Sequence, residues 1–243
     1  MKNTVFTGMA TAIVTPMTRD GIDYEALGRF LEFQIENGIN AIVVMGTTGE
    51  NATIEYADQK EIIRFTVEKV AKRVPVIAGT GTNNTAHVLE NTKNACEAGA
   101  DAVLVVTPYY NKTTQKGLVT MYNTIADAST KPCILYNVPG RTGCGIAAET
   151  YAALAEHPNI VAVKEASGDF SLIQKTKELC PEDFYIWSGN DEDTAAVCML
   201  GGVGAAAVFF APQSALVSLS TQIFGAAVLC AAAFAPCPPR LFV

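Results

Sequence analysis

Lys164 is the residue best placed for chemistry, because it lies within an apolar run, IVAVKEAS, at residues 160–167. The run has the composition of a buried strand, and lysine is among the last residues expected in one. A free ammonium group has a pKa near ~10.4, so roughly one in 2,500 is neutral at pH 7. Desolvation or a nearby cation that lowered this pKa to ~7 would make the amine a nucleophile for carbonyl carbons. The alternative is a lysine at a strand end whose ammonium extends to water.

The other candidate residues lie where further predicted strands end. Hydroxyl groups can relay protons there, and an arginine can pair bidentately with a carboxylate. With an amine that attacks a ketone, they are what a Schiff-base enzyme for a small keto acid needs. The structural alternatives are core tyrosines, turn-capping threonines and a solvated arginine. The residues at these strand ends are Thr47, Thr48, Tyr109, Tyr110, Tyr136, Arg141 and Gly189.

The pattern of the chain predicts a scaffold in which strands end on one rim. Short apolar runs recur, each followed by a segment of helical period, which indicates a parallel sheet covered by helices. Eight such units predict an α/β fold, the closed (β/α)8 TIM barrel, whose enzymes place their chemistry at the carboxyl ends of the strands. An open doubly wound sheet is the alternative, but no GxGxxG turn follows the first strand. The predicted strands are 9–16, 41–46, 75–79, 102–107, 133–138, 160–166, 184–188 and 204–210.

Polar residues between these strands predict where helices begin. Asp23 and Asp169 are expected to be N-caps, each followed by an apolar stripe of helical spacing. Thr53 is expected to precede a second helix and Thr85 to open a third that ends at Gly99, and another is expected around residues 118–128. Helices therefore separate the strands, as a barrel of this type requires.

Composition argues against several classes of protein. Charged residues make up 17% of the 243 residues and the net charge is −7, with no basic cluster, so we expect no nucleic-acid partner. The amino terminus, MKNTVFT, has no apolar signal core, so we expect a cytoplasmic protein. The seven cysteines form no CxxC pair, and His87 and His157 lie far apart, so we expect reduced thiols and no metal site.

Three motifs in order carry a resemblance to a known family. They are GTTGE at 46–50, YNVPGRT at 136–142 and KEASGD at 164–169. Together they resemble the dihydrodipicolinate synthase family, the class I pyruvate-dependent aldolases of the lysine and diaminopimelate pathway. The match runs from about residue 6 to residue 204. It implies a (β/α)8 barrel that condenses pyruvate with L-aspartate 4-semialdehyde, as a 4-hydroxy-tetrahydrodipicolinate synthase, and needs no cofactor.

The resemblance implies a catalytic role for four residues. Lys164 would form the imine with pyruvate, and Tyr136 would pass protons to and from it. Thr47 and Tyr110 would complete the proton relay. In the family this second tyrosine reaches across from a neighbouring subunit, which implies a homo-oligomer, either a dimer or a tetramer.

The resemblance also implies where the substrates bind. Thr48 matches a contact to the pyruvate carboxylate, and Arg141 matches the residue that holds the carboxylate of the semialdehyde. Gly189 and Ala206 are the other expected binding positions, Ala206 through its main chain. Some members bind lysine as an inhibitor at positions matching Asn51, Tyr56, Asn83, His87 and Tyr109. Tyr56 and His87 depart from the residues expected in a lysine-inhibited enzyme, so we expect this inhibition to be weakened or lost.

The carboxyl-terminal part departs from the family. Residues 194–239 contain no charged side chain, and Ala205-Ala206-Ala207-Val208 stand where family members carry Val-Ile-Ser-Val. We therefore predict a catalytic barrel domain over 1–210. An atypical apolar tail over 211–243 is expected in place of the last barrel helix and the family's carboxyl-terminal helices.

Two explanations could account for this tail. A membrane anchor is disfavoured, because the purely apolar stretch 223–235 is shorter than the ~20 residues that a span requires. We favour a frameshift or truncation near residue 205. Such a barrel would expose an apolar seam and tend to aggregate.

Other functions stay open at this point. A sister pyruvate lyase, cleaving N-acetylneuraminate or a keto-deoxy sugar acid, would share the imine chemistry. The pairs Thr47-Thr48 and Tyr109-Tyr110 favour the synthase over those lyases. From a different class, the chain could be an inactive remnant or only an assembly subunit.

Overall fold

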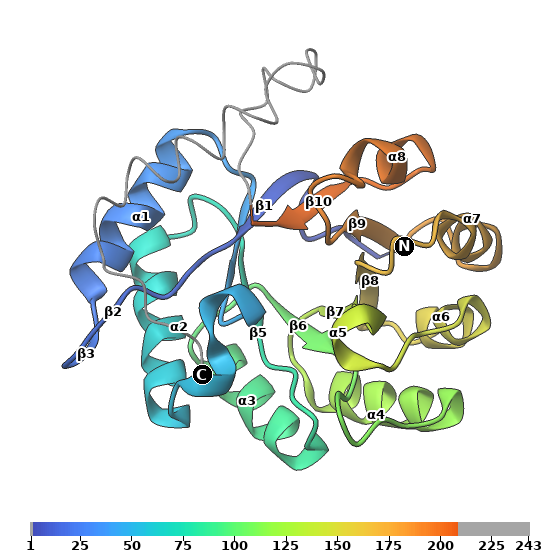
Figure 1. Ribbon diagram of the computed structural model, residues 1–243, viewed down its shortest axis with the longest axis horizontal. Coiled ribbons are helices and arrows are strands. Elements are labelled where there is room, and N and C mark those ends of the chain that lie inside the picture. The colour runs from blue at the N-terminus through green and yellow to red at the C-terminus, as the bar shows by residue number, and fades with distance from the viewer. Residues whose placement is uncertain (1, 209–243) are drawn as a thin grey trace.

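The computed structural model describes residues 2–208, which form a closed barrel of parallel strands (Figure 1). The order around the barrel is β1, β4, β5, β6, β7, β8, β9 and β10, and β10 pairs with β1 to close it. This confirms the predicted (β/α)8 barrel. The strands are β1 (Gly8–Ala12), β4 (Ala41–Val44), β5 (Val76–Gly79), β6 (Ala102–Val106), β7 (Cys133–Asn137), β8 (Ile160–Glu165), β9 (Tyr185–Ser188) and β10 (Gly204–Ala207).

The strands form where the sequence is apolar on both faces, because one face meets the barrel interior and the other meets the helices. Every residue of β7 and of β8 is buried. The predicted runs contain the observed strands, apart from Gly8 at the start of β1, but the first run was expected to continue to Pro16. It ends at Ala12. The backbone N–H of Ile13 still donates to the carbonyl of Val43 (3.0 Å), and beyond it the Thr15 hydroxyl donates to the carbonyl of Gly49 (2.7 Å).

Outer helices follow all the strands of the barrel except β10 within the described part of the chain. In Figure 1 they ring the barrel from α1 at the left round to α8 at the upper right. The helices are α1 (Tyr24–Glu36), α2 (Tyr56–Val70), α3 (Thr85–Glu97), α4 (Gln115–Ala128), α6 (Ala148–Ala155), α7 (Phe170–Leu179) and α8 (Thr194–Met199).

The predicted helix starts are right at three positions and displaced at a fourth. The Asp23 carboxylate accepts from the backbone of Ala26 (2.8 Å), and Asp169 caps α7 in the same way. Thr85 is the first residue of α3, as predicted, and Asn84 caps this helix. Thr53 does not adjoin α2, because a short 3-10 helix, η2 (Asn51–Thr53), intervenes.

Some short elements were not predicted. A hairpin of β2 (Met17–Thr18) and β3 (Gly21–Ile22) precedes α1, and its strands are too short to show an alternating pattern. Near the rim lie a 3-10 helix, η1 (Thr47–Gly49), and a single helical turn, α5 (Pro139–Thr142).

Two apolar clusters hold the barrel together. The inner cluster takes side chains from alternate positions of the strands, and within it Phe6 stacks on Trp187 with 4.5 Å between ring centroids. The outer cluster lies between the strands and the helices, and includes Tyr151 of α6 and Tyr122 of α4. Lys164 therefore lies on a strand, β8, that is packed against apolar side chains on both faces.

The eighth strand is in place despite its unusual sequence. Ala205 of β10 pairs with Met9 of β1 and with Ser188 of β9, so the barrel closes through three consecutive alanines. The predicted tail, 211–243, lies outside the described residues. Within residues 2–208, no helix combines the length and apolarity that a membrane crossing requires.

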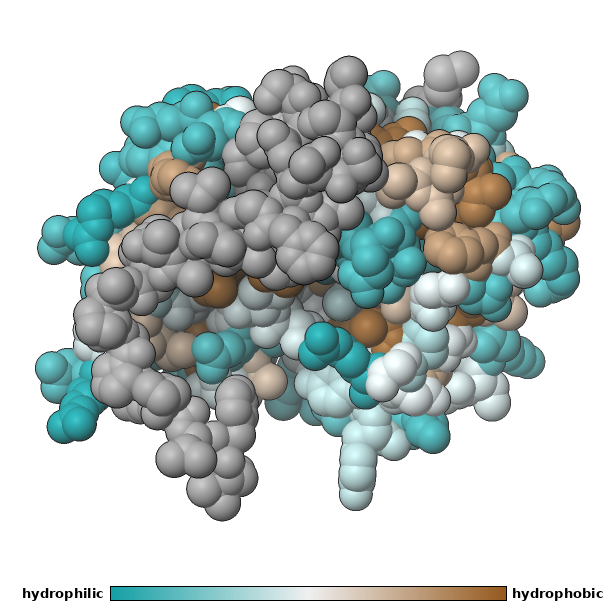
Figure 2. All heavy atoms as spheres, turned by 45° about the horizontal axis from the view of Figure 1, so that its top comes forward, coloured by the Kyte–Doolittle hydropathy of each residue, from teal (hydrophilic) through white to brown (hydrophobic). Residues whose placement is uncertain are grey.

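The surface around α8 is unusually apolar. Figure 2 shows hydrophobic side chains gathered at the upper right, in the region of this helix, next to hydrophilic surface. Met199, the last residue of α8, is 83% exposed, and Val208 beyond β10 is 46% exposed. These residues lie in the uncharged stretch where an apolar seam was predicted.

Candidate active site

Lys164 lies in the barrel wall with its side chain directed inward. It pairs in register with Tyr136 of β7 on one side and with Trp187 of β9 on the other. Its Nζ atom is 4.5 Å from the centroid of the Tyr136 ring. Lys164 is 7% exposed, so its ammonium does not extend to water as the structural alternative required.

Burial changes the chemistry of both side chains of this pair. Loss of hydration lowers the pKa of Lys164, the Asp191 carboxylate opposes this, and the Arg141 guanidinium adds to the lowering, which leaves the pKa at about 8. At pH 7 a pKa of about 8 leaves roughly one amine in ten neutral. Burial raises the pKa of Tyr136 while Arg141 lowers it, so at neutral pH the phenol keeps a proton that it can donate.

Gly189 permits the close packing around the lysine. A Cβ atom at this position would lie 2.7 Å from Cβ of Ala166 and 3.0 Å from Cε of Lys164. The Gly189 amide also donates to the carbonyl of Glu165 (2.7 Å). A side chain here would crowd Ala166 and the aliphatic part of Lys164, so the glycine leaves the space that the lysine occupies.

Thr47 and Thr48 lie at the rim on the turn that follows β4. The turn depends on Met45, which is buried and has a left-handed backbone with φ of 55°. Its carbonyl oxygen approaches Gly79 so closely that a Cβ there would be 2.1 Å away. Beyond this corner, η1 leaves Thr47 exposed and Thr48 half-buried.

The remaining predicted residues, Ala206, Arg141 and Tyr110, differ in how deeply they are buried. Ala206 is buried in the inner cluster with Tyr136, and Arg141 is exposed on α5 but acts on the pKa of Lys164. Tyr110 is 92% exposed and has a left-handed φ of 67°. A single chain therefore does not bury Tyr110 beside the lysine.

Two functional neighbours were missed by sequence reasoning. Asp191 raises the pKa of Lys164, and it follows β9 only two residues after Gly189. Its position beyond a strand end was a usable signal. Trp187 is the only tryptophan of the chain and pairs with Lys164, which only the register reveals.

A hollow of about 300 Å³ is lined by the five positions at which the resemblance implied lysine binding. The Tyr56 hydroxyl is 2.9 Å from Nδ1 of His87 within it. Asn51, Asn83 and Tyr109 also line this hollow, so the structure brings all five positions together.

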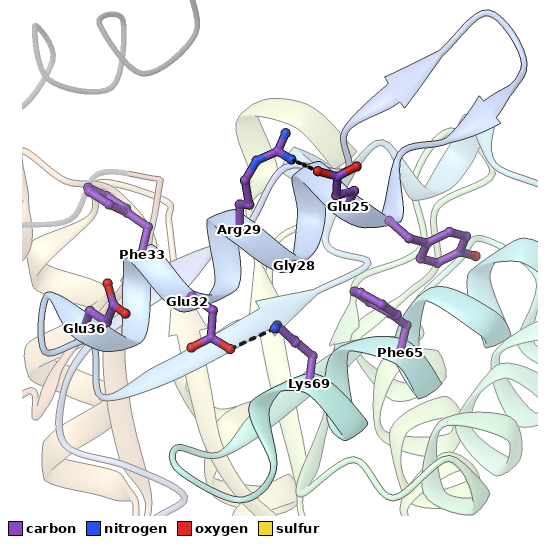
Figure 3. Close-up of a pocket in the computed structure, with 9 residues that line it drawn as sticks. Glu25, Gly28, Arg29, Glu32, Phe33, Glu36, Phe65 and Lys69 are labelled. Atoms are coloured by element: carbon purple, nitrogen blue, oxygen red, sulfur yellow. Dashed lines mark hydrogen bonds and ion pairs between the residues drawn. The ribbon is translucent and has the colours of Figure 1, made fainter.

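A groove of about 530 Å³ lies elsewhere, on the outside of the barrel between α1 and α2 (Figure 3). Phe33 of α1 and Phe65 of α2 line it, and Lys69 forms an ion pair with Glu32 (3.2 Å). All of its lining residues lie on these two outer helices, away from the inward-facing lysine. It is not part of the candidate active site.

Comparison with known proteins decides the family. The model of the dihydrodipicolinate synthetase family matches residues 5–220, which is most of the chain. The chain belongs to this family. A relative from Acetivibrio thermocellus, named 4-hydroxy-tetrahydrodipicolinate synthase, is 50% identical over 208 residues, covering 86% of this chain and 70% of the relative. One of the same name from Clostridium perfringens is 52% identical over 204 residues, covering 84% of this chain and 70% of the relative.

Solved structures agree with the family and with the fold. Dihydrodipicolinate synthase from Aquifex aeolicus superposes with a TM-score of 0.82 at 42% identity, covering 84% of this chain and 70% of that one. The enzyme from Cyanidioschyzon merolae, solved with lysine bound, gives 0.84 at 38% identity, covering 94% of this chain and 81% of that one. The fold and the resemblance predicted from the motifs are both confirmed.

Proposed function

We propose that this chain is a 4-hydroxy-tetrahydrodipicolinate synthase, a lyase that condenses pyruvate with L-aspartate 4-semialdehyde. The observation that carries the proposal is the buried Lys164, whose pKa is lowered to about 8 and whose Nζ lies against the ring of Tyr136. Relatives about 50% identical over most of the chain bear this name.

The reaction follows from the chemistry of a neutral amine. Lys164 attacks the ketone carbon of pyruvate, and loss of water gives an imine whose nitrogen withdraws electrons from the neighbouring methyl group. Loss of a methyl proton gives an enamine, and its carbon attacks the aldehyde of the second substrate. The amine of that substrate then attacks the imine carbon, closes the ring and releases Lys164. The imine is the electron sink, so no step calls for a cofactor.

The side chains around Lys164 have the properties that these steps require. Tyr136 holds a proton close to the amine and passes it to and from the imine, with Thr47 as the next member of the relay. Thr48 binds the pyruvate carboxylate, and Gly189 and the Ala206 main chain shape the site around it. Arg141, exposed at the rim, pairs with the carboxylate of the semialdehyde. These assignments are supported by position and by the pKa directions of the buried pair.

We also propose that the working form is a homo-oligomer in which Tyr110 of one chain completes the proton relay of another. A 92% exposed tyrosine with a left-handed backbone is unfavourable in an isolated chain and is favoured if a partner covers it. One structural neighbour is titled the first monomeric dihydrodipicolinate synthase variant, so a monomer is the alternative outcome. Size-exclusion chromatography tests this proposal: a dimer or tetramer is expected, and an active monomer would contradict it.

We propose that the catalytic barrel domain spans residues 1–210. Its support is that β10 closes the barrel at Ala207. We propose that the protein acts in the cytoplasm, where a biosynthetic aldolase meets its substrates. Fractionation of cells that produce the chain should place it in the soluble fraction, and recovery in the membrane fraction would contradict this.

The substrate is tested by offering both candidate reactions to one preparation. Consumption of pyruvate that depends on aspartate semialdehyde is expected, with no pyruvate released from N-acetylneuraminate or from a keto-deoxy sugar acid. Release of pyruvate from either acid at a comparable rate would favour the sister lyases. A folded protein that turns over none of these substrates would be an inactive remnant.

We further propose that lysine inhibits this chain weakly or not at all. In the hollow that matches the lysine site, Tyr56 and His87 bind each other rather than leave their polar atoms free for a ligand. Titrating lysine against the condensation rate tests this. Half-inhibition at micromolar lysine would contradict it.

A further inference from the structure

A buried carboxylate lies directly behind the reactive lysine and has no role in the chemistry above. Glu165 follows Lys164 at the end of β8 and is 4% exposed. Successive side chains of a strand point to opposite faces, so Lys164 faces the barrel interior while Glu165 faces the helices. Burying a carboxylate is costly unless it is hydrogen-bonded, so its partners need an explanation.

Three donors from three separate segments converge on this carboxylate. Nδ2 of Asn137, at the end of β7, lies 3.0 Å from both oxygens. The Tyr151 hydroxyl, from α6, donates to Oε2 at 2.7 Å, and the backbone N–H of Ser167 donates to Oε1 at 2.9 Å. Asn137 in turn accepts from the backbone of Ile146 (3.1 Å), just before α6. One carboxylate therefore ties together the end of β7, the turn after β8 and the helix that covers both.

The register shows what this arrangement holds in place. Asn137 pairs with Glu165 in the same ladder in which Tyr136 pairs with Lys164, one residue earlier. The pair Asn137–Glu165 thus lies on the outer face of the strand ends, and the pair Tyr136–Lys164 lies on their inner face. Any slip or separation that the outer hydrogen bonds prevent would move Lys164 relative to Tyr136.

We propose that Glu165 is a positioning residue for the imine chemistry: its hydrogen bonds to Asn137, Tyr151 and Ser167 lock the ends of β7 and β8 so that Lys164 and Tyr136 keep their reacting geometry. The proposal rests on the proposed function. Glu165 acts through geometry, because it faces the helices on the side of β8 opposite to Lys164. Misplacement of reacting groups by about 1 Å can lower the rate about a hundredfold. Loss of some of the hydrogen bonds to Glu165 is therefore expected to give a measurable fall in rate.

The test is borohydride trapping of pyruvate on the whole chain. Three quantities are measured: the maximal trapping rate, the pyruvate concentration that gives half of this rate, and the pH at which the rate is half of its plateau. Tyr151→Phe removes one donor and leaves the carboxylate. Glu165→Gln keeps the shape but has a single acceptor oxygen for donors that now approach two. Tyr122→Phe is the matched control, because its buried hydroxyl, on α4, donates to the carbonyl of Val105 (3.2 Å) and not to the Glu165 cluster.

We expect Tyr151→Phe and Glu165→Gln to lower the maximal trapping rate about tenfold. Half-saturation by pyruvate should change by less than about twofold, because other residues hold its carboxylate. The pH midpoint should rise, because water reaching Lys164 would return its pKa towards the ordinary value. Tyr122→Phe should leave all three quantities unchanged, and circular dichroism should show each variant folded.

Each other outcome counts against the proposal. If Tyr151→Phe and Glu165→Gln trap pyruvate as fast as the parent, or if Tyr122→Phe loses as much as they do, the cluster is only structural and the proposal is wrong. If Tyr151→Phe fails to fold, the trapping rate of Glu165→Gln compared with that of Tyr122→Phe still tests the proposal. If the parent chain itself forms no adduct, the proposed function fails and this proposal fails with it.

Discussion

Replacing Lys164 by methionine is expected to stabilise the folded protein while removing its chemistry. Methionine has a similar length and fills the same space without a charge. Lowering the pKa of Lys164 from 10.5 to about 8 corresponds to roughly 3 kcal/mol of unfavourable burial for the charged amine. For a domain of about 200 residues this predicts a rise in Tm of roughly 6–12 °C at pH 7.

The pH dependence of this gain follows from the two states of the lysine. Below about pH 8 the amine is protonated in both the folded and the unfolded chain, so the folded parent carries the whole cost. Between about pH 8 and 10.5 the folded chain releases its proton while the unfolded chain keeps it, so the parent becomes more stable as pH rises. The advantage of Lys164→Met should therefore be complete at pH 7 and vanish near pH 10.5.

Thermal unfolding of parent and variant from pH 6.5 to pH 10.5 is the assay. Lys116→Met is the control, because Lys116 is exposed and its loss should change stability by less than about 0.5 kcal/mol. Equal Tm values for Lys164→Met and the parent at pH 7 would refute the claim that the buried ammonium destabilises the folded protein. A gain in Tm that is as large at pH 10.5 as at pH 7 would refute it as well.

The remaining predictions concern the imine step. Tyr136→Phe should lower kcat for the condensation by about 10²–10⁴-fold, because the proton relay loses its hydroxyl, and a fall of less than about threefold would contradict that role. Gly189→Ala should slow borohydride trapping at least about tenfold, since its Cβ would meet Lys164 and Ala166. Gly140→Ala, whose Cβ would meet nothing within 4 Å, should leave trapping unchanged, and equal effects of the two would argue against the packing account. In the parent the trapping rate should rise with pH through about 8 and then level off, and a midpoint near 10.5 would mean that the amine is not desolvated.

The sequence predicted most of the barrel because its signals are local. The apolar runs that became β7 and β8 are buried on both faces and stand out from their neighbours. Asp23 and Asp169 were recognisable as caps because a cap needs only one residue followed by a helical pattern. The β2–β3 hairpin and the displaced start of α2 were not predicted, because they depend on very short elements.

The candidate site was predicted less completely, because much of it depends on register. Lys164 was conspicuous as a lysine in an apolar strand, and its burial and lowered pKa agree with that interpretation. That Trp187 pairs with it, and that Asp191 acts on it, follows from how β8 and β9 align. Glu165 was part of a recognised motif, but its partners, such as Tyr151 of α6, come from segments whose contact no local pattern indicates. Tyr110 is 92% exposed, which agrees with the expectation that this tyrosine reaches toward a neighbouring subunit.

The most direct test of the central claim is borohydride reduction in the presence of pyruvate, followed by intact mass measurement and peptide mapping. The account predicts one reduced pyruvyl adduct per chain, located on Lys164, and none on the Lys164→Met variant. A folded, soluble protein that forms no adduct, or an adduct located on another lysine, would contradict it.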